Sequence, residues 1–209
     1  MLISQEFWFA YLFLHSANEK KDINPVFSCG KERIFFMNKS RRILLCALLI
    51  ASCVVLGRIL SIRTNIITIG FSFVPIMLGA IILGPKYSTF IATISDIIGA
   101  LLFPTGSYFF GFTITAFLTG LTYGLILYRK DFKVDKNFII RLIISTIIVT
   151  GIYNGVLNTI WIIMINKSAS KIVIPIRIAK QLIMAPIKVT TITAICKIME
   201  ERLKKLIND

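Results

Sequence analysis

Long apolar runs, separated by short charged or turn-forming stretches, follow one another from residue 43 to residue 199. A helix needs about 20 consecutive apolar residues to cross a membrane, and these runs approach or exceed that length. The pattern therefore predicts an all-α integral membrane protein built as a bundle of six transmembrane helices. The predicted spans are Ile43–Ile62, Ile66–Leu83, Tyr87–Phe103, Gly111–Tyr128, Phe138–Ile165 and Ile178–Met199.

The first 36 residues do not follow this pattern. The run EFWFAYLFLH is apolar but too short to span, and the polar stretch after it has no periodicity. It also lacks the basic head and small-residue cleavage site of a secretory signal peptide. Met37 then opens a short basic segment that leads directly into the first span. We expect residues 1–36 to be a disordered extension or a mis-assigned start, and residues 37–209 to form the six-helix, substrate-binding membrane domain.

Basic residues orient the spans. An even number of spans places both termini on one side, and lysine and arginine are enriched in cytoplasmic loops. With both termini in the cytoplasm, 14 of the 24 lysines and arginines lie inside, six lie outside and four lie in the extension. This bias accounts for the net charge of +14, so the charge gives no reason to expect a nucleic-acid partner.

The six basic residues on the predicted outer side are not explained by membrane sorting. They lie near the outer ends of the first and last spans, where the one nearby carboxylate is Asp96 within the third span. An anionic ligand would supply the missing charge. Alternatively, the side chains extend to the headgroups of membrane lipid. Both interpretations stay open for Lys167 and Lys171, whereas the ligand interpretation is favoured for Arg58, Arg177 and Lys180.

Asp96 is the one carboxylate inside a predicted span. It would accept hydrogen bonds from an amino-bearing ring, pair with an arginine, or simply join two helices. The uncharged turn after it, FPTGSYFFGFT at 103–113, is rich in aromatic residues and lies at the predicted outer mouth of the bundle. We expect this turn to form one wall of a ligand site, with candidates Tyr108, Phe112 and Thr113.

The fifth and sixth spans carry amides and a tryptophan. Asn154 and Asn158 are four residues apart and share a helix face, and Trp161 follows three residues later. Amides read the edge of a planar heterocycle and an aromatic ring stacks on it, although membrane asparagines also join helices. Gln181 follows Arg177 by four residues and adds an amide on the side of that cation.

Motifs for catalysis are missing from the sequence. It contains no GxxxxGK[ST] phosphate-binding loop, no HExxH and no GxSxG, and its four cysteines form no CxxC. No cofactor or metal site is therefore expected. A membrane enzyme acting on lipid or isoprenoid headgroups, with Asp96 as a base, remains a less favoured alternative. The pattern indicates a binding subunit whose energy source lies in other proteins.

Five segments are typical of one transporter family: RILSI at 58–62, FSFVPIMLGAIILGP at 71–85, SDIIGALLFPTGSYFFGFTITAFLTGLTYGLILY at 95–128, YNGVLNTIW at 153–161 and RIAKQLIMAPI at 177–187. From Met37 onward the chain resembles the substrate-binding S components of energy-coupling factor (ECF) vitamin transporters, and within them the folate-specific FolT family. The block at 95–128 is the most specific, although Ser107 and Phe110 stand where the family loop usually has prolines.

This resemblance implies an S component of a bacterial plasma membrane that captures folate from outside. Its partners would be the transmembrane coupling protein EcfT and two cytoplasmic ATPases, which hydrolyse ATP for uptake. Ala47 and Ala51 match the AxxxA contact by which S components dock on the coupling protein. Amides and aromatics would take the folate rings, and Arg58, Arg63, Arg177 or Lys180 its carboxylates. Another vitamin or precursor, such as pantothenate or a queuosine precursor, is the alternative ligand.

Overall fold

The computed structural model describes residues 39–63, 68–103, 109–129, 134–165 and 170–208, so the extension predicted at 1–36 lies outside the described residues. Nearly all of the described chain is helical. In chain order the elements are α2 (Lys39–Val54), the π-helix η1 (Val55–Ile59), β1 (Ile62–Arg63), β2 (Thr68–Ile69), α3 (Phe73–Leu83), α4 (Pro85–Leu102), α5 (Phe110–Leu127), α6 (Lys136–Ile147), the π-helix η2 (Ile148–Leu157), α7 (Asn158–Ile165) and α8 (Ser170–Asn208).

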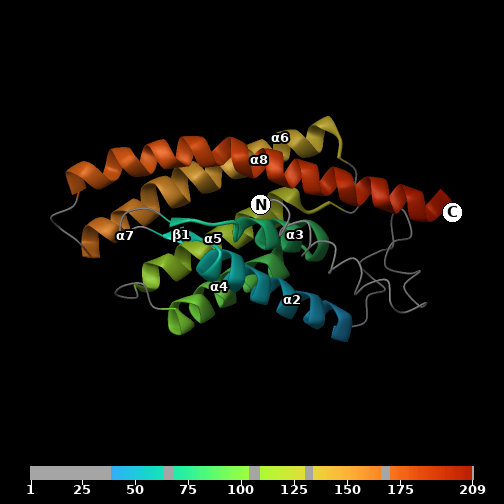
Figure 1. Ribbon diagram of the computed structural model, residues 1–209, viewed down its shortest axis with the longest axis horizontal. Helices are drawn as coiled ribbons and strands as arrows, with labels where there is room; N and C mark the ends of the chain where they lie inside the picture. Colours follow the sequence, from blue (N-terminus) through green and yellow to red (C-terminus); the bar gives the residue numbers. More distant parts are fainter. Residues whose placement is uncertain (1–38, 64–67, 104–108, 130–133, 166–169, 209) are drawn as a thin grey trace.

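The helices form a bundle in which α8 runs the length of one side, next to the continuous rod formed by α6, η2 and α7 (Figure 1). The shorter helices α2, α3, α4 and α5 pack against one another on the other side. Apolar side chains from α3, α5, α6 and α8 meet in the core, which includes the fully buried Met77, Tyr123, Leu142 and Ile192.

Each predicted span overlaps a helix of the structure. Four helical stretches are long and apolar enough to cross a membrane: Arg42–Ile59, Phe110–Leu127, Lys136–Ile165 and Pro175–Glu201. The remaining two helices are not among these: α3 is a shorter apolar helix of 11 residues, and α4 has 18 residues but is less apolar. The described chain is thus a helical membrane protein with several membrane-spanning helices.

The prediction was wrong for the start of the second span, which was expected to be helical from Ile66. Instead, β1 and β2 form an antiparallel hairpin, and α3 begins only at Phe73. The chain folds back closely here, since a Cβ at Gly70 would lie 3.0 Å from the Ser61 Cβ. A short apolar run does not distinguish a strand from a helix, because both bury the same residue types.

Two of the spans contain π-helical turns. Such turns are rare, insert an extra residue per turn and often occur at functional sites. The first, η1, carries Arg58 at the end of the first span, and the second, η2, carries Asn154 in the middle of the fifth. Both polar side chains therefore lie on backbone that departs from the regular α-helix.

Small residues let α4 and α5 approach closely. Gly120 and Gly124 are four residues apart on α5, and the hydroxyl of Ser88 on α4 donates a hydrogen bond to the Gly120 carbonyl. A Cβ at Gly124 would overlap the Cα of Pro85 at the start of α4. Because apolar side chains gain little from leaving lipid for another helix, such close backbone contact is an important source of helix association in membranes.

Candidate substrate-binding site

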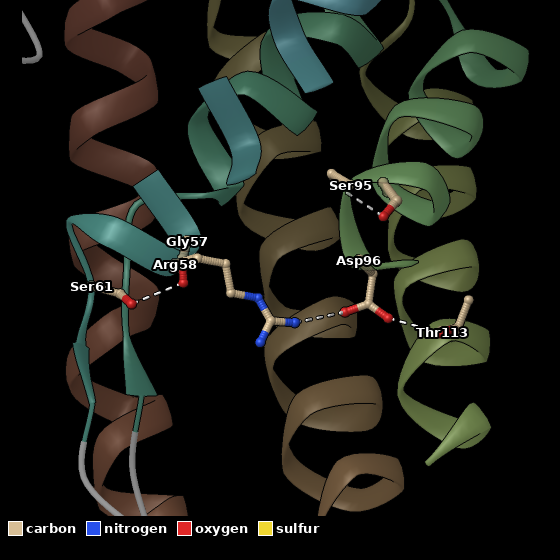
Figure 2. A network of polar contacts seen from close by, with 7 residues as sticks. Gly57, Arg58, Ser61, Ser95, Asp96 and Thr113 are labelled. Atoms are coloured by element: carbon tan, nitrogen blue, oxygen red, sulfur yellow. Dashed lines mark hydrogen bonds and ion pairs between the residues drawn. The ribbon is translucent and has the colours of Figure 1, made fainter. Parts of the chain in front are cut away.

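Charged and polar side chains from three helices meet where η1 ends and α5 begins. The guanidinium Nη2 of Arg58 lies 3.8 Å from Oδ1 of Asp96 on α4, as Figure 2 shows. The other carboxylate oxygen of Asp96 accepts a 2.9 Å hydrogen bond from the Thr113 hydroxyl on α5. Of the interpretations left open for Asp96, the structure shows the pairing with an arginine, and that arginine is Arg58. Both charged side chains nevertheless keep about a fifth of their surface exposed, 20% for Arg58 and 23% for Asp96.

Gly99 makes room for this ion pair. It is buried on α4, three residues after Asp96, and a Cβ there would lie 2.6 Å from Nε of Arg58 and 3.3 Å from its Cγ. The guanidinium therefore passes over the bare backbone of α4 on its way to the carboxylate. Sequence reasoning did not single out this glycine, although an isolated glycine inside an apolar helix often marks a close approach of another group.

A set of aromatic rings lies at the same end of α5 as Thr113. The rings of Phe109 and Trp161 lie 5.4 Å apart between centroids, and Phe109 meets Phe112 edge to face at 6.3 Å. The indole nitrogen of Trp161 donates a 3.2 Å hydrogen bond to the Thr115 hydroxyl, which fixes the ring against the first turns of α5. Gly111 lies directly under the two rings, since a Cβ there would be 2.6 Å from the Trp161 Cδ2.

The two asparagines of the fifth span are in contact, as their spacing predicted. The amide nitrogen of Asn158 donates a 3.0 Å hydrogen bond to the side-chain oxygen of Asn154. Asn154 in turn donates to the carbonyl of Val149, five residues earlier in the π-helix, at 3.1 Å. The side-chain oxygen of Asn158 is buried and has no hydrogen-bond partner among the described residues. It is therefore an acceptor available to a donor group of a ligand.

Two cations lie on α8, which faces the rod formed by η2 and α7. Arg177 and Lys180 are partly buried and close enough for their charges to repel each other. Neither forms an ion pair with a described carboxylate, and the buried Nε of Arg177 has no hydrogen-bond partner among the described residues. Gln181 is also partly buried on this helix. Together these side chains are suited to an anion with more than one oxygen.

The structure joins the predicted candidates in separate sets: the ion pair with Thr113, the aromatic rings around Phe109, the two asparagines, and the cations of α8. Thr113 of the ion-pair network and Thr115 of the aromatic set are two residues apart in the first turns of α5, so both sets lie at the same end of that helix. Tyr108 lies outside the described residues, and of Arg63 only the backbone in β1 is described. The predicted docking residues Ala47 and Ala51 are instead exposed on α2.

Known proteins match the chain in sequence and in structure. Residues 41–196 match the family described as "ECF transporter, substrate-specific component". The chain is 34% identical to the folate transporter FolT of Clostridium novyi (strain NT) over 164 residues, which are 78% of this chain and 92% of that protein. It is 38% identical to FolT of Leuconostoc mesenteroides subsp. mesenteroides over 155 residues, or 72% and 81% of the two chains.

Two solved structures share the fold. One is described as the crystal structure of FolT bound with folic acid. It superposes with a TM-score of 0.68 at 31% identity, covering 76% of this chain and 93% of that one. The S component of a bacterial ECF transporter superposes with a TM-score of 0.57 at 22% identity, over 82% and 100% of the two chains.

The resemblance drawn from the five sequence segments is thereby confirmed. The family consists of the substrate-binding components of membrane transporters, which are not enzymes. The helical bundle, its apolar spans and the match over most of the chain agree with one another. This chain belongs to the family of substrate-specific (S) components of ECF transporters.

Proposed function

We propose that this protein captures folate from outside the cell as the S component of an ECF transporter. The observation that carries the proposal is the match to FolT bound with folic acid over 93% of that chain. The side chains at one end of the bundle suit such a ligand. Folate combines a flat, amino-bearing pterin, an aromatic linker and a glutamate with two carboxylates, and the site combines amides, aromatic rings and cations.

Within this proposal the residues divide by chemistry. Asn154 and Asn158 read the edge of the pterin, and the rings of Phe112 and Trp161 stack on the flat parts of the ligand. Arg177, Lys180 and Gln181 bind the glutamate, because the two neighbouring cations have no described carboxylate partner and the amide adds donors on the same helix. Asp96 accepts a hydrogen bond from the amino group of the aromatic linker while Arg58 and Thr113 hold the carboxylate in place. Tyr108 and Arg63 form the side of the proposed ligand site that faces the outside of the cell.

The proposed topology has six spans with both termini in the cytoplasm of a bacterium. The distribution of lysine and arginine supports this orientation. The site then opens to the outside, because Arg58, Trp161 and Arg177 all lie toward the ends of their helices on that side. Residues 37–209 form the binding domain, and the preceding residues form an extension to it.

The proposed partners are the transmembrane coupling protein EcfT and two ATPases that hydrolyse ATP. The exposed pair Ala47 and Ala51 on α2 offers a flat surface on which a coupling helix can pack closely. We expect Ala47→Trp to prevent copurification of the complete transporter while folate binding by the isolated protein persists. Loss of folate binding as well would mean that Ala47 belongs to the interior of the protein.

Calorimetric titration of the purified protein in detergent tests the ligand directly. Folate and 5-formyltetrahydrofolate are compared with pantothenate and with a queuosine precursor. We expect saturable binding of the folates at micromolar concentration or below, and no heat from the other two compounds. Absence of folate binding at micromolar ligand, in protein whose helical content is intact, would refute the proposal.

A further inference from the structure

Lys188 is a buried cation that the binding site described so far does not use. It lies on α8 with only 8% of its surface exposed. Its ammonium Nζ is 3.4 Å from the Thr150 hydroxyl on η2 and 5.8 Å from the centre of the Phe73 ring on α3. It forms no ion pair with a described carboxylate. An ammonium has three N–H donors, and burying one this incompletely paired is costly.

Lys188 lies on the same side of α8 as the predicted site residues Arg177 and Gln181, but further toward the middle of the bundle. On α8, Arg177, Gln181 and Lys188 follow at intervals of four and seven residues, which places them on one helix face. On the facing rod, Thr150, Asn154 and Asn158 follow at intervals of four. The two rods run in opposite directions side by side (Figure 1), so the Lys188–Thr150 contact sets Asn158 toward the Gln181 end of α8.

These two rows of polar side chains define a seam between α8 and the η2–α7 rod. At a rise of about 1.5 Å per residue, the seam extends roughly 16 Å from Arg177 to Lys188. Three of its polar groups lack full partners among the described residues: the Arg177 Nε, the Asn158 oxygen and the Lys188 ammonium. Buried polar groups are normally satisfied, so an elongated polar ligand lying along the seam would account for all three.

We propose that Lys188 and Thr150 form the inner end of the ligand site and that Lys188 donates a hydrogen bond to the 4-oxo oxygen of the pterin ring. This inference rests on the proposed folate function. The ring end of the ligand lies inward because Arg177 and Lys180 take the carboxylates at the outer end, where desolvation is less costly. The 4-oxo oxygen is the proposed partner of the ammonium because it is a carbonyl oxygen, which accepts hydrogen bonds, on an uncharged ring. The ring of Phe73 lies near the ammonium and forms the apolar inner boundary of the proposed site.

Lys188→Met tests the inference, since methionine keeps an unbranched chain but cannot donate a hydrogen bond. Lys197→Met, at an exposed lysine of the same helix, is the matched control. Affinities for folate and for pteroate, which lacks the glutamate, are measured by calorimetry for both variants and the wild type. We expect Lys188→Met to weaken both ligands by the same factor of tenfold or more, and Lys197→Met to leave both unchanged.

A second readout separates a ligand contact from a structural role. The 4-amino analogue of folate replaces the proposed acceptor by a donor, so the wild type is expected to prefer folate and Lys188→Met to lose that preference. Thr150→Val keeps the lysine and is expected to weaken folate binding several-fold; it serves as the test if Lys188→Met does not fold.

The outcomes distinguish this inference from the proposed function. Wild-type protein that binds no folate refutes both. Folate binding that is unchanged in Lys188→Met and Thr150→Val, a loss confined to folate with pteroate unaffected, or an undiminished preference over the 4-amino analogue overturns the role of Lys188 alone.

Discussion

A single methyl group at Gly99 is expected to weaken ligand binding without destabilising the fold. In Gly99→Ala the new Cβ would lie 2.6 Å from the Arg58 Nε, whereas ordinary contacts begin near 3.4 Å, so the guanidinium must retreat by about 0.8 Å. The Arg58–Asp96 separation of 3.8 Å then exceeds the range of an ion pair. We expect no backbone strain, because the atoms nearest the new Cβ all belong to the flexible Arg58 side chain.

The size of the effect follows from the interactions of Asp96. A hydrogen bond to a charged group contributes about 1.5–3 kcal/mol, and here it is weakened rather than removed. We therefore expect a loss of about 1–2 kcal/mol, or roughly 5- to 30-fold in the folate Kd. The melting temperature should be unchanged or slightly raised, since alanine is favoured over glycine within a helix by about 0.5–1 kcal/mol. Calorimetry and thermal unfolding in detergent measure the two quantities.

Two controls test whether the effect is specific to Gly99 and acts through Arg58. Gly151→Ala introduces the same methyl group where no atom lies within 4 Å, and it should leave folate affinity unchanged. If Gly99 acts through Arg58, then adding Gly99→Ala to an Arg58→Ala variant should cause no further loss, because the two changes remove the same interaction. Additive losses in the double variant, or wild-type affinity in Gly99→Ala, would refute the reasoning.

Further substitutions address other parts of the site and the fold. Arg177→Ala should weaken folate by about 1–3 kcal/mol and pteroate much less, since the arginine is assigned to the glutamate; equal losses in titrations of both ligands would make it structural. Trp161→Phe, which keeps a ring but loses the 3.2 Å hydrogen bond to Thr115, should lower folate affinity by about 0.5–1.5 kcal/mol, with Trp161→Ala costing more. The reverse order would exclude stacking on this residue. Gly124→Ala should destabilise the protein by about 1–3 kcal/mol, measured by thermal unfolding, because its methyl group meets the backbone of Pro85. An unchanged melting temperature would contradict the packing of α4 on α5.

The chemical character of the site could be foreseen from residue type and spacing. Asn154 and Asn158 are in contact because residues four apart are neighbours on a helix. Trp161 was expected to be available as an aromatic surface and is held by the Thr115 hydroxyl. Long-range partners could not be foreseen in the same way. The pairing of Arg58 with Asp96 joins residues 38 positions apart, and the sequence left it as one of three interpretations of the carboxylate.

The sequence also did not predict where the backbone departs from a regular α-helix. The π-helical turns that carry Arg58 and Asn154 have the composition of ordinary apolar helix, so residue type alone does not reveal them. The sequence predicts the start of a span at the hairpin before α3, because isoleucine and threonine suit a buried strand as well as a membrane helix. Gly99 was overlooked because its importance depends on a side chain from another helix.

The sequence by itself determined that this is a helical membrane protein of the S-component family, where most of its helices lie, and which chemistry it offers a ligand. Hydrophobic runs and local spacing are sufficient for these conclusions, because solvation by lipid and helix geometry act on neighbouring residues. Only the tertiary structure decided that Arg58 pairs with Asp96 over a bare glycine and that Lys188 is buried against Thr150 and Phe73. Those contacts depend on how whole helices pack, which no local pattern specifies.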